Sequence, residues 1–225
     1  MDMNPVNGRR QPRQKRSLEK VETILDAVET LVARDGVEAL TTTAVAKHSG
    51  MAVGTIYQYF SNRTEMALET YERMFERLAA QIEEEAVRGD HGKDGDDPIR
   101  RLIFLYLNNA ENHPGFIPLL QFARINRRHE EVKSSAEEKI EKLVNQYLNL
   151  YLPELDATDL YVVRHIVLRL LRTLVDAVLL QSDPELRARF SEELVEHCKF
   201  AIERARLTLG DVSEERGAAM VIQGD

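Results

Sequence analysis

Apolar residues recur every three or four positions along most of the chain, and no stretch alternates apolar and polar residues for long enough to predict a strand. Between Leu18 and Val32 the apolar residues are spaced three, three, one, three, three and one position apart, which places them on one face of a helix. Ser17 is suited to cap the start of this helix, and Gly36 is suited to end it. The sequence therefore predicts an all-α fold.

The same pattern predicts about nine helices, four in a compact N-terminal head and five in a larger C-terminal bundle. After the first helix they are expected at residues 41–49, 53–60, 62–87, 99–112, 115–125, 130–151, 157–181 and 184–209. The segment "RGDHGKDGDDP" at 88–98 is rich in glycine and aspartate, so it predicts a loop. Residues 210–225 lack periodicity and are expected to be a flexible tail.

The composition is that of a soluble globular protein, with 43% hydrophobic and 30% charged residues. The single cysteine, Cys198, excludes an internal disulfide and fits a reducing cytoplasm. It lies on an apolar stripe, where we expect a small buried side chain rather than a redox sensor. No apolar run approaches the ~20 residues of a membrane span, and the N-terminus lacks a signal-peptide pattern. We therefore expect a cytoplasmic protein without membrane contact.

Charge is distributed unevenly along the chain. The net charge is −8, but residues 1–63 hold nine Lys and Arg against seven Asp and Glu, a net of +2. Residues 1–17 alone hold five basic residues and one acidic residue. This asymmetry indicates a basic end that contacts a polyanion and an acidic body that does not. The alternative for residues 1–17 is a solvated disordered tail without a partner.

Residues 41–60 combine a short helix, a glycine turn and a second short helix, which together predict a helix-turn-helix with its second helix in the major groove of DNA. Ile56 and Phe60, four positions apart, are expected to face inward. Gly54 keeps its surroundings open for a close approach of the backbone to DNA. The side chains expected to contact phosphates or base edges are Val53, Thr55, Tyr57, Gln58, Tyr59 and Arg63. The alternative for Tyr57 and Tyr59 is packing against the first helix.

The stretch "TTTAVAKHSGMAVGTIYQYFSNRTEM", residues 41–66, resembles the DNA-binding head of the tetracycline-repressor (TetR) family of bacterial regulators. The resemblance covers roughly residues 18–70 and rests on Val45, Ala46, Ser49, Gly50, Gly54, Thr55, Ile56, Tyr57, Tyr59 and Phe60 at the family's spacing. It implies that Thr42 contacts a phosphate and that Thr43 faces the bases. It also implies that Thr55, Tyr57 and Tyr59 contact the DNA backbone or bases, with Arg63 at a phosphate-binding position.

Charge, periodicity and the resemblance together predict the following domain organisation. Residues 1–17 form a basic disordered arm, 18–63 the DNA-binding domain, 64–209 a ligand-binding and dimerisation domain, and 210–225 the tail. A single recognition helix reads few bases, so such heads act in pairs on palindromic operators in double-stranded DNA. The resemblance implies a homodimer through the helices at 157–181 and 184–209. In the arm, Arg13, Lys15 and Arg16 are expected to follow the minor groove.

The resemblance places a pocket for a small-molecule effector between the middle helices of the larger domain. The expected lining residues are Phe104, Phe116, Phe122, Arg124, Tyr147, Tyr151, His165, Arg169 and Arg172. With Asp176, the last three form a polar stripe on an otherwise apolar helix. That stripe is either paired with neighbouring charges or at the dimer interface, or lines the pocket for an anionic ligand, or is exposed.

Catalytic patterns are missing from the sequence. The six histidines show no metal-ligand spacing, and no Gly-rich phosphate loop or nucleophile elbow is present. We therefore expect no enzymatic activity, cofactor or metal. The function expected is a ligand-responsive transcriptional repressor. The alternatives are a transcriptional activator of the same fold, and a helical small-molecule-binding or protein-binding module that does not bind DNA.

Overall fold

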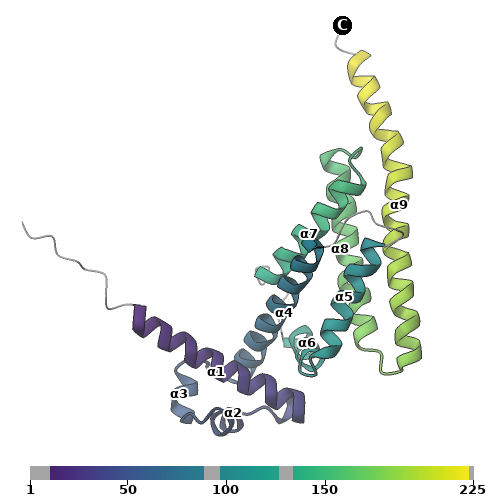
Figure 1. Ribbon diagram of the computed structural model, residues 1–225. Helices are drawn as coiled ribbons and strands as arrows, with labels where there is room; N and C mark the ends of the chain where they lie inside the picture. The colour runs from purple at the N-terminus through teal and green to yellow at the C-terminus, as the bar shows by residue number, and fades with distance from the viewer. Residues whose placement is uncertain (1–10, 89–96, 127–133, 223–225) are drawn as a thin grey trace, which may run out of the picture. The chain divides into compact units, whose positions relative to one another are not determined.

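The computed structural model describes residues 11–88, 97–126 and 134–222, and every regular element in these ranges is helical (Figure 1). The elements are α1 (Gln11–Asp35), the 3-10 helix η1 (Val37–Ala39), α2 (Thr42–Ser49), α3 (Val53–Tyr57), α4 (Arg63–Arg88), α5 (Pro98–Asn112), α6 (Phe116–Asn126), α7 (Ser135–Tyr151), α8 (Ala157–Leu179) and α9 (Pro184–Ile222). The predicted all-α fold with about nine helices is confirmed. None of the helices among the described residues has the length and apolar character that crossing a membrane requires.

The packing divides the described residues into two compact units. The first comprises residues 11–75 and 113–126, and the second comprises 76–88, 97–112 and 134–222. This division differs from the predicted boundary at residue 63, because α4 continues through both units and α6 packs with the head. Apolar burial explains the place of α6: Phe116 and Leu119 are buried, and the Phe116 ring lies 5.7 Å from that of Tyr71 on α4.

Helix α1 begins earlier than the sequence predicted. Ser17 lies inside the helix instead of capping it, so residues 11–17 of the predicted disordered arm form the first two turns. These positions hold Gln, Arg and Lys, which favour helix, and Pro12 is in the first turn, where its missing N–H leaves no hydrogen bond unmade. Residues 1–10 lie outside the described residues. The predicted end is confirmed, since Gly36 follows α1 with a positive φ of 79°.

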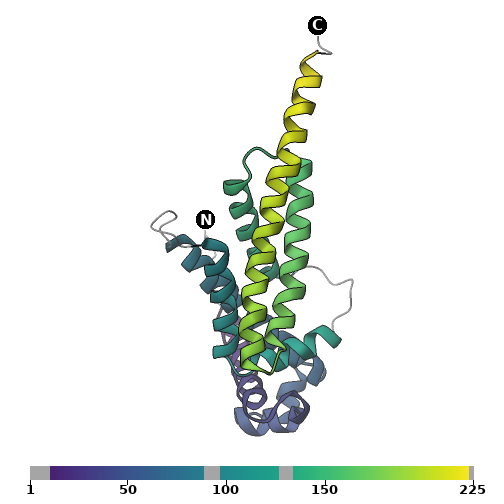
Figure 2. The same cartoon turned by 90° about the vertical axis from the view of Figure 1, so that its right-hand side faces the viewer.

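The second unit is built on α8 and α9, which run antiparallel and side by side (Figure 2). Helix α7 completes the core, where Leu148 and Leu152 pack with Val163 and Val167 of α8. A capping box starts α7: the Ser134 hydroxyl accepts from the Glu137 amide, and the Glu137 carboxylate accepts from the Ser134 amide. This cap fixes the start of α7 five residues later than predicted.

Helix α5 is held against α9 by ion pairs at both of its ends. Near the start of α5, Arg100 pairs with Glu192, and at the far end Glu111 pairs with Arg187. Helix α9 itself extends to Ile222, so it continues beyond the predicted helix end at Leu209 into the segment predicted to be a flexible tail. Residues 210–222 contain no proline, and nothing in them forces the helix to stop at Leu209.

Candidate nucleic-acid interface

Helix α2 is capped at its start by a threonine and ends in a tight glycine turn that leads to α3. The Thr41 side chain accepts a hydrogen bond from the Ala44 amide at 3.1 Å and so caps the start of α2. At the other end, Gly50 has a φ of 69°, the left-handed conformation that glycine adopts without strain. The chain therefore leaves α2 abruptly, and α3 begins three residues later.

Two buried side chains hold α3 in place. Ile56 and Phe60 are both buried, which confirms that they face inward. Helix α3 ends at Tyr57 rather than Phe60, but the amides of Tyr59 and Phe60 still donate to the Ile56 carbonyl, so the chain keeps turning around this anchor. A helix of five residues has little stability of its own, and these contacts fix its position.

The outer face of α3 is open to solvent. Tyr57 is 57% exposed and Val53 is 38% exposed, although both are large hydrophobic side chains of a kind that is usually buried. A side chain added at Gly54 would meet no atom within 4 Å, so another molecule can approach the backbone closely there. Gln58 and Thr43 are also exposed, whereas Thr42 and Thr55 are half-buried. More than half of the Tyr57 side chain is therefore accessible to another molecule.

Tyr59 lies differently from Tyr57. It is half-buried, and its hydroxyl accepts a hydrogen bond from the Ser17 hydroxyl of α1 at 3.4 Å. The contact with the first helix, the alternative that the sequence left open, is therefore present for Tyr59. Its own hydroxyl hydrogen is still available as a donor to a phosphate.

The basic residues predicted to contact DNA lie on two helices. Lys15 and Arg16 are exposed in the first turns of α1. They directly precede Ser17, whose hydroxyl donates to the Tyr59 hydroxyl. Arg13 belongs to α1 too, but its side chain lies outside the described residues. Arg63, at the start of α4, has its guanidinium 3.6 Å from the Glu38 carboxylate. An exposed pair of this kind contributes little energy, so a phosphate could replace Glu38.

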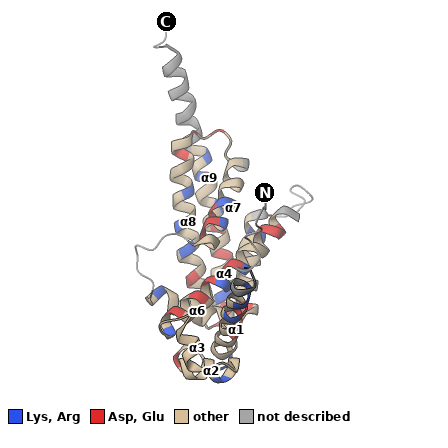
Figure 3. Cartoon of the chain, turned by 90° about the vertical axis from the view of Figure 1, so that its left-hand side faces the viewer, with Lys and Arg blue, Asp and Glu red and all other residues tan. Residues whose placement is uncertain are grey.

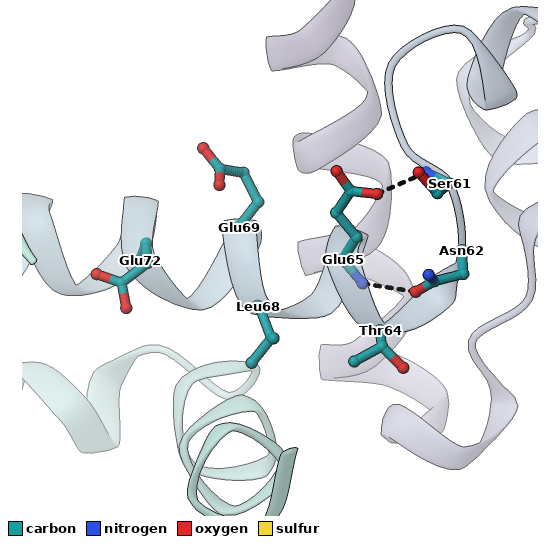
Figure 4. A pocket seen from close by; sticks show the side chains of 7 residues that line it. All are labelled: Ser61, Asn62, Thr64, Glu65, Leu68, Glu69 and Glu72. Atoms are coloured by element: carbon teal, nitrogen blue, oxygen red, sulfur yellow. Dashed lines mark hydrogen bonds between the residues drawn. The ribbon is translucent and has the colours of Figure 1, made fainter. Parts of the chain in front are cut away.

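The start of α4 is held by reciprocal hydrogen bonds that the sequence analysis did not identify (Figure 4). The Asn62 side chain accepts from the Glu65 amide at 2.9 Å, and the Glu65 carboxylate accepts from the Ser61 amide at 2.6 Å. The open pocket beside them also contains Glu69 and Glu72. Its acidic lining repels phosphates, so it does not extend the DNA-binding surface.

The predicted effector-binding residues are distributed over both units. Phe116, Phe122 and Arg124 belong to α6 of the first unit, where both phenylalanines are buried and Arg124 is exposed. In the second unit, Phe104 and Tyr147 are half-buried, and Phe104 lies 4.8 Å beneath the Arg100 guanidinium. The side chain of Tyr151 lies outside the described residues.

The polar stripe on α8 is exposed. His165, Arg169 and Arg172 all face solvent; His165 stacks on Tyr161, and the Arg172 guanidinium lies 3.6 Å from the Glu137 carboxylate. The fourth member of the stripe, Asp176, is half-buried, so exposure and partial pairing together describe what is observed. Exposed side chains at these positions argue against a role in lining an enclosed pocket.

Known proteins resemble the chain in both its head and its body. Residues 24–70 match the family model for bacterial regulatory proteins of the tetR family, and residues 96–199 match the model for a tetracyclin repressor-like C-terminal domain. The HTH-type transcriptional repressor KstR of Mycolicibacterium smegmatis is 34% identical over 94 residues, which cover 41% of this chain and 43% of that protein. The chain thus matches less than half of the length of this relative. KstR of Mycobacterium tuberculosis is also 34% identical over 94 residues, 40% of its length.

The fold is shared along most of the chain. The crystal structure of a TetR-family transcriptional regulator from Streptomyces coelicolor covers 83% of this chain and 99% of its own, with 25% identity and a TM-score of 0.57. The open α3 face on a buried anchor agrees with the DNA-binding head that the family model describes. The chain therefore belongs to the TetR family of bacterial regulatory proteins, with a helix-turn-helix DNA-binding head.

Proposed function

We propose that the protein is a cytoplasmic repressor that binds a palindromic operator as a homodimer and is released by a small-molecule effector. The observation that carries this proposal is the outer face of α3, where Tyr57 and Val53 are exposed above the buried Ile56. An exposed tyrosine beside an open backbone position suits contact with the bases and phosphates of the major groove. Repression is favoured because the KstR proteins that the head resembles are named repressors.

The support for a homodimer is the concentration of exposed apolar side chains on α8 and α9. Among the described residues, eight of the twelve large apolar side chains that are exposed lie on these two helices and the turn between them. They are Tyr161, Val162, Ile166, Leu180, Leu186, Phe190, Phe200 and Leu207. Apolar surface gains about 25 cal/mol for each Å² removed from water, and a second copy of the same surface covers it symmetrically.

The support for an effector is weaker and lies in the family's C-terminal domain, which the chain matches over residues 96–199. We propose a mostly apolar molecule, with half-buried Phe104 and Tyr147 among its contacts in the second unit. Binding would tilt α4, which belongs to both units, and change the spacing of the two heads. The effector must bind the released state more tightly than the DNA-bound state, since only differential affinity shifts such an equilibrium.

The test is selection of binding sites from a random duplex library, with the purified chain at two salt concentrations. We expect a palindromic consensus whose affinity falls as the salt concentration rises, because phosphate contacts release counterions. Tyr57→Ala should abolish the enrichment. Tyr57→Phe, which keeps the ring and removes the hydroxyl, is the matched control and should keep the consensus with reduced affinity. Well-folded protein that enriches no duplex at low salt would overturn the proposal.

A further inference from the structure

A nearly buried arginine joins α4 to α1 within the first unit. The side chain of Arg73 on α4 is only 12% exposed. Its Nη1 donates to the carboxylates of Glu22 and Asp26 at 2.8 Å each. Its Nη2 donates to the carboxylate of Glu29 at 2.9 Å. One guanidinium therefore holds three carboxylates, which follow one another at intervals of four and three residues on one face of α1.

This arrangement depends on the guanidinium and its charge. Burial alone would lower the pKa of Arg73, but its hydrogen-bonded acidic neighbours outweigh burial and raise the pKa above its usual value. Acidic positions line both α1 and α4 (Figure 3). Without Arg73, three carboxylates on one face of α1 would repel one another, which disfavours their present spacing. A lysine has a single ammonium and cannot reproduce the planar fork that reaches all three.

Helix α3 packs against α2, and the two helices that Arg73 joins both contact the segment that follows α3, residues 58–62. Helix α4 begins six residues after α3 ends, at the cap that Asn62 provides. Helix α1 contacts the same segment through the hydrogen bond that the Ser17 hydroxyl donates to the Tyr59 hydroxyl. Because α3 has only five residues, its position depends on its packing against α2 and on how the segment after it is held. The angle between α1 and α4 therefore affects how Tyr57 is presented.

Helix α6 meets α1 at the same place. An added Cβ at Gly115, just before α6, would lie 3.3 Å from the carbonyl oxygen of Glu29, closer than most real contacts. Beside it, the rings of Tyr71 on α4 and Phe116 on α6 lie 5.7 Å apart. Glu29 thus lies where α1, α4 and α6 come together, and Arg73 bonds to it directly.

We propose that Arg73 is a positioning residue for DNA binding: by fixing α1 against α4 through Glu22, Asp26 and Glu29, it sets the orientation in which α3 meets the operator. The inference rests on the proposed function and adds a residue to it that does not itself touch DNA. Its consequence is that operator affinity depends on Arg73 even when the head remains folded.

The test compares Arg73→Met and Arg73→Lys with Lys139→Met, which removes one positive charge from α7 in the second unit. Affinity for a duplex selected by the natural chain is measured at a temperature where circular dichroism shows every variant to be folded. We expect Arg73→Met to lose at least about tenfold in affinity, which corresponds to about 1.4 kcal/mol. Arg73→Lys should recover part of the loss, and Lys139→Met should bind like the natural chain. Unchanged affinity of folded Arg73→Met would overturn the proposal.

A second comparison separates position from net charge. Glu22→Gln combined with Arg73→Met has the net charge of the natural chain but lacks the arginine. Positioning predicts that the double variant stays impaired, whereas a pure charge effect predicts full recovery, which would refute the proposal.

A third measurement needs no DNA. Amide hydrogen exchange across residues 53–57 should be at least about tenfold faster in Arg73→Met than in Lys139→Met, because local opening becomes easier when α3 loses a support. Equal exchange rates would also overturn the inference. If the natural chain selects no duplex, the proposed function fails, and the exchange rates still decide whether Arg73 positions α3.

Discussion

The basic first turns of α1 give a quantitative prediction about DNA binding. The change is Lys15→Gln together with Arg16→Gln. Both side chains are exposed and lie next to Ser17, whose hydroxyl bonds to Tyr59 beside α3. We therefore expect both to contact phosphates when α3 lies in the major groove. Neither carries sequence information through such contacts, so the preferred consensus should be kept.

The magnitude follows from counterion release. Each phosphate contact adds about 0.9 to the slope of log affinity against log salt concentration. Two contacts in each protomer of a dimer make four, so the double variant should flatten the slope by about 3.6. Between 50 and 200 mM salt, the natural chain should then lose about 150-fold more affinity than the variant does.

The assay is fluorescence anisotropy with the selected duplex at four or more salt concentrations. Lys139→Gln with Lys142→Gln on α7 is the control, because it removes the same charge from the second unit; the exposed pair of Lys142 with Glu83, at 3.8 Å, contributes little. The control should leave the slope unchanged. A double variant at Lys15 and Arg16 whose slope equals that of the natural chain would refute the argument that these side chains contact phosphates.

Three further predictions concern the dimer, the turn and the cysteine. The Phe200 side chain on α9 is 68% exposed, and Phe200→Glu should yield monomers in sedimentation experiments with unchanged helix content. The control Ile125→Glu on α6 should remain dimeric, and a dimeric Phe200→Glu variant would contradict the proposed interface. Gly50→Ala should lower the free energy of unfolding in urea by about 1 kcal/mol, because alanine is strained at positive φ while nothing crowds its Cβ. Gly50→Asn should lower it less, and a Gly50→Ala variant as stable as the natural chain would contradict the argument from strain. Burial raises the pKa of the Cys198 thiol from 9.0 to about 11, so at pH 8 native protein should react with iodoacetamide far more slowly than protein in urea, and stability should fall as the pH rises from 9 to 11. Equal reaction rates in both conditions would mean that the thiol is accessible.

Periodicity predicted the helices and their inward faces, because burial of an apolar stripe is a local requirement of the sequence. It predicted Ile56 and Phe60 as anchors for the same reason. The start of α1 was not predictable, since Ser17 resembles a cap but the residues before it also favour helix. Whether Tyr59 would contact α1 remained open, because the answer depends on a partner 42 residues away.

Tertiary contacts account for the remaining differences. Arg73 and its partners are separated by 44 to 51 residues, and no local pattern connects them. The assignment of α6 to the first unit depends on the close approach of Gly115 to α1, which the helical period does not encode. The polar stripe on α8 was identified as unusual, but which of its side chains are exposed depends on how α7 and α9 pack on α8, and no local pattern encodes that packing.

Because α4 is continuous, it restricts where the head of this protein can be joined to the second unit of another protein. The boundary between the two units falls between Phe75 and Glu76, in the interior of this helix. Inserting one residue there would turn everything that follows by about 100° and displace it by about 1.5 Å. Seven inserted residues come within about 20° of two full turns and restore the phase. Under the proposed function, chimeras that join this head to the second unit of a relative should therefore respond to an effector only when the joint within α4 conserves helical phase.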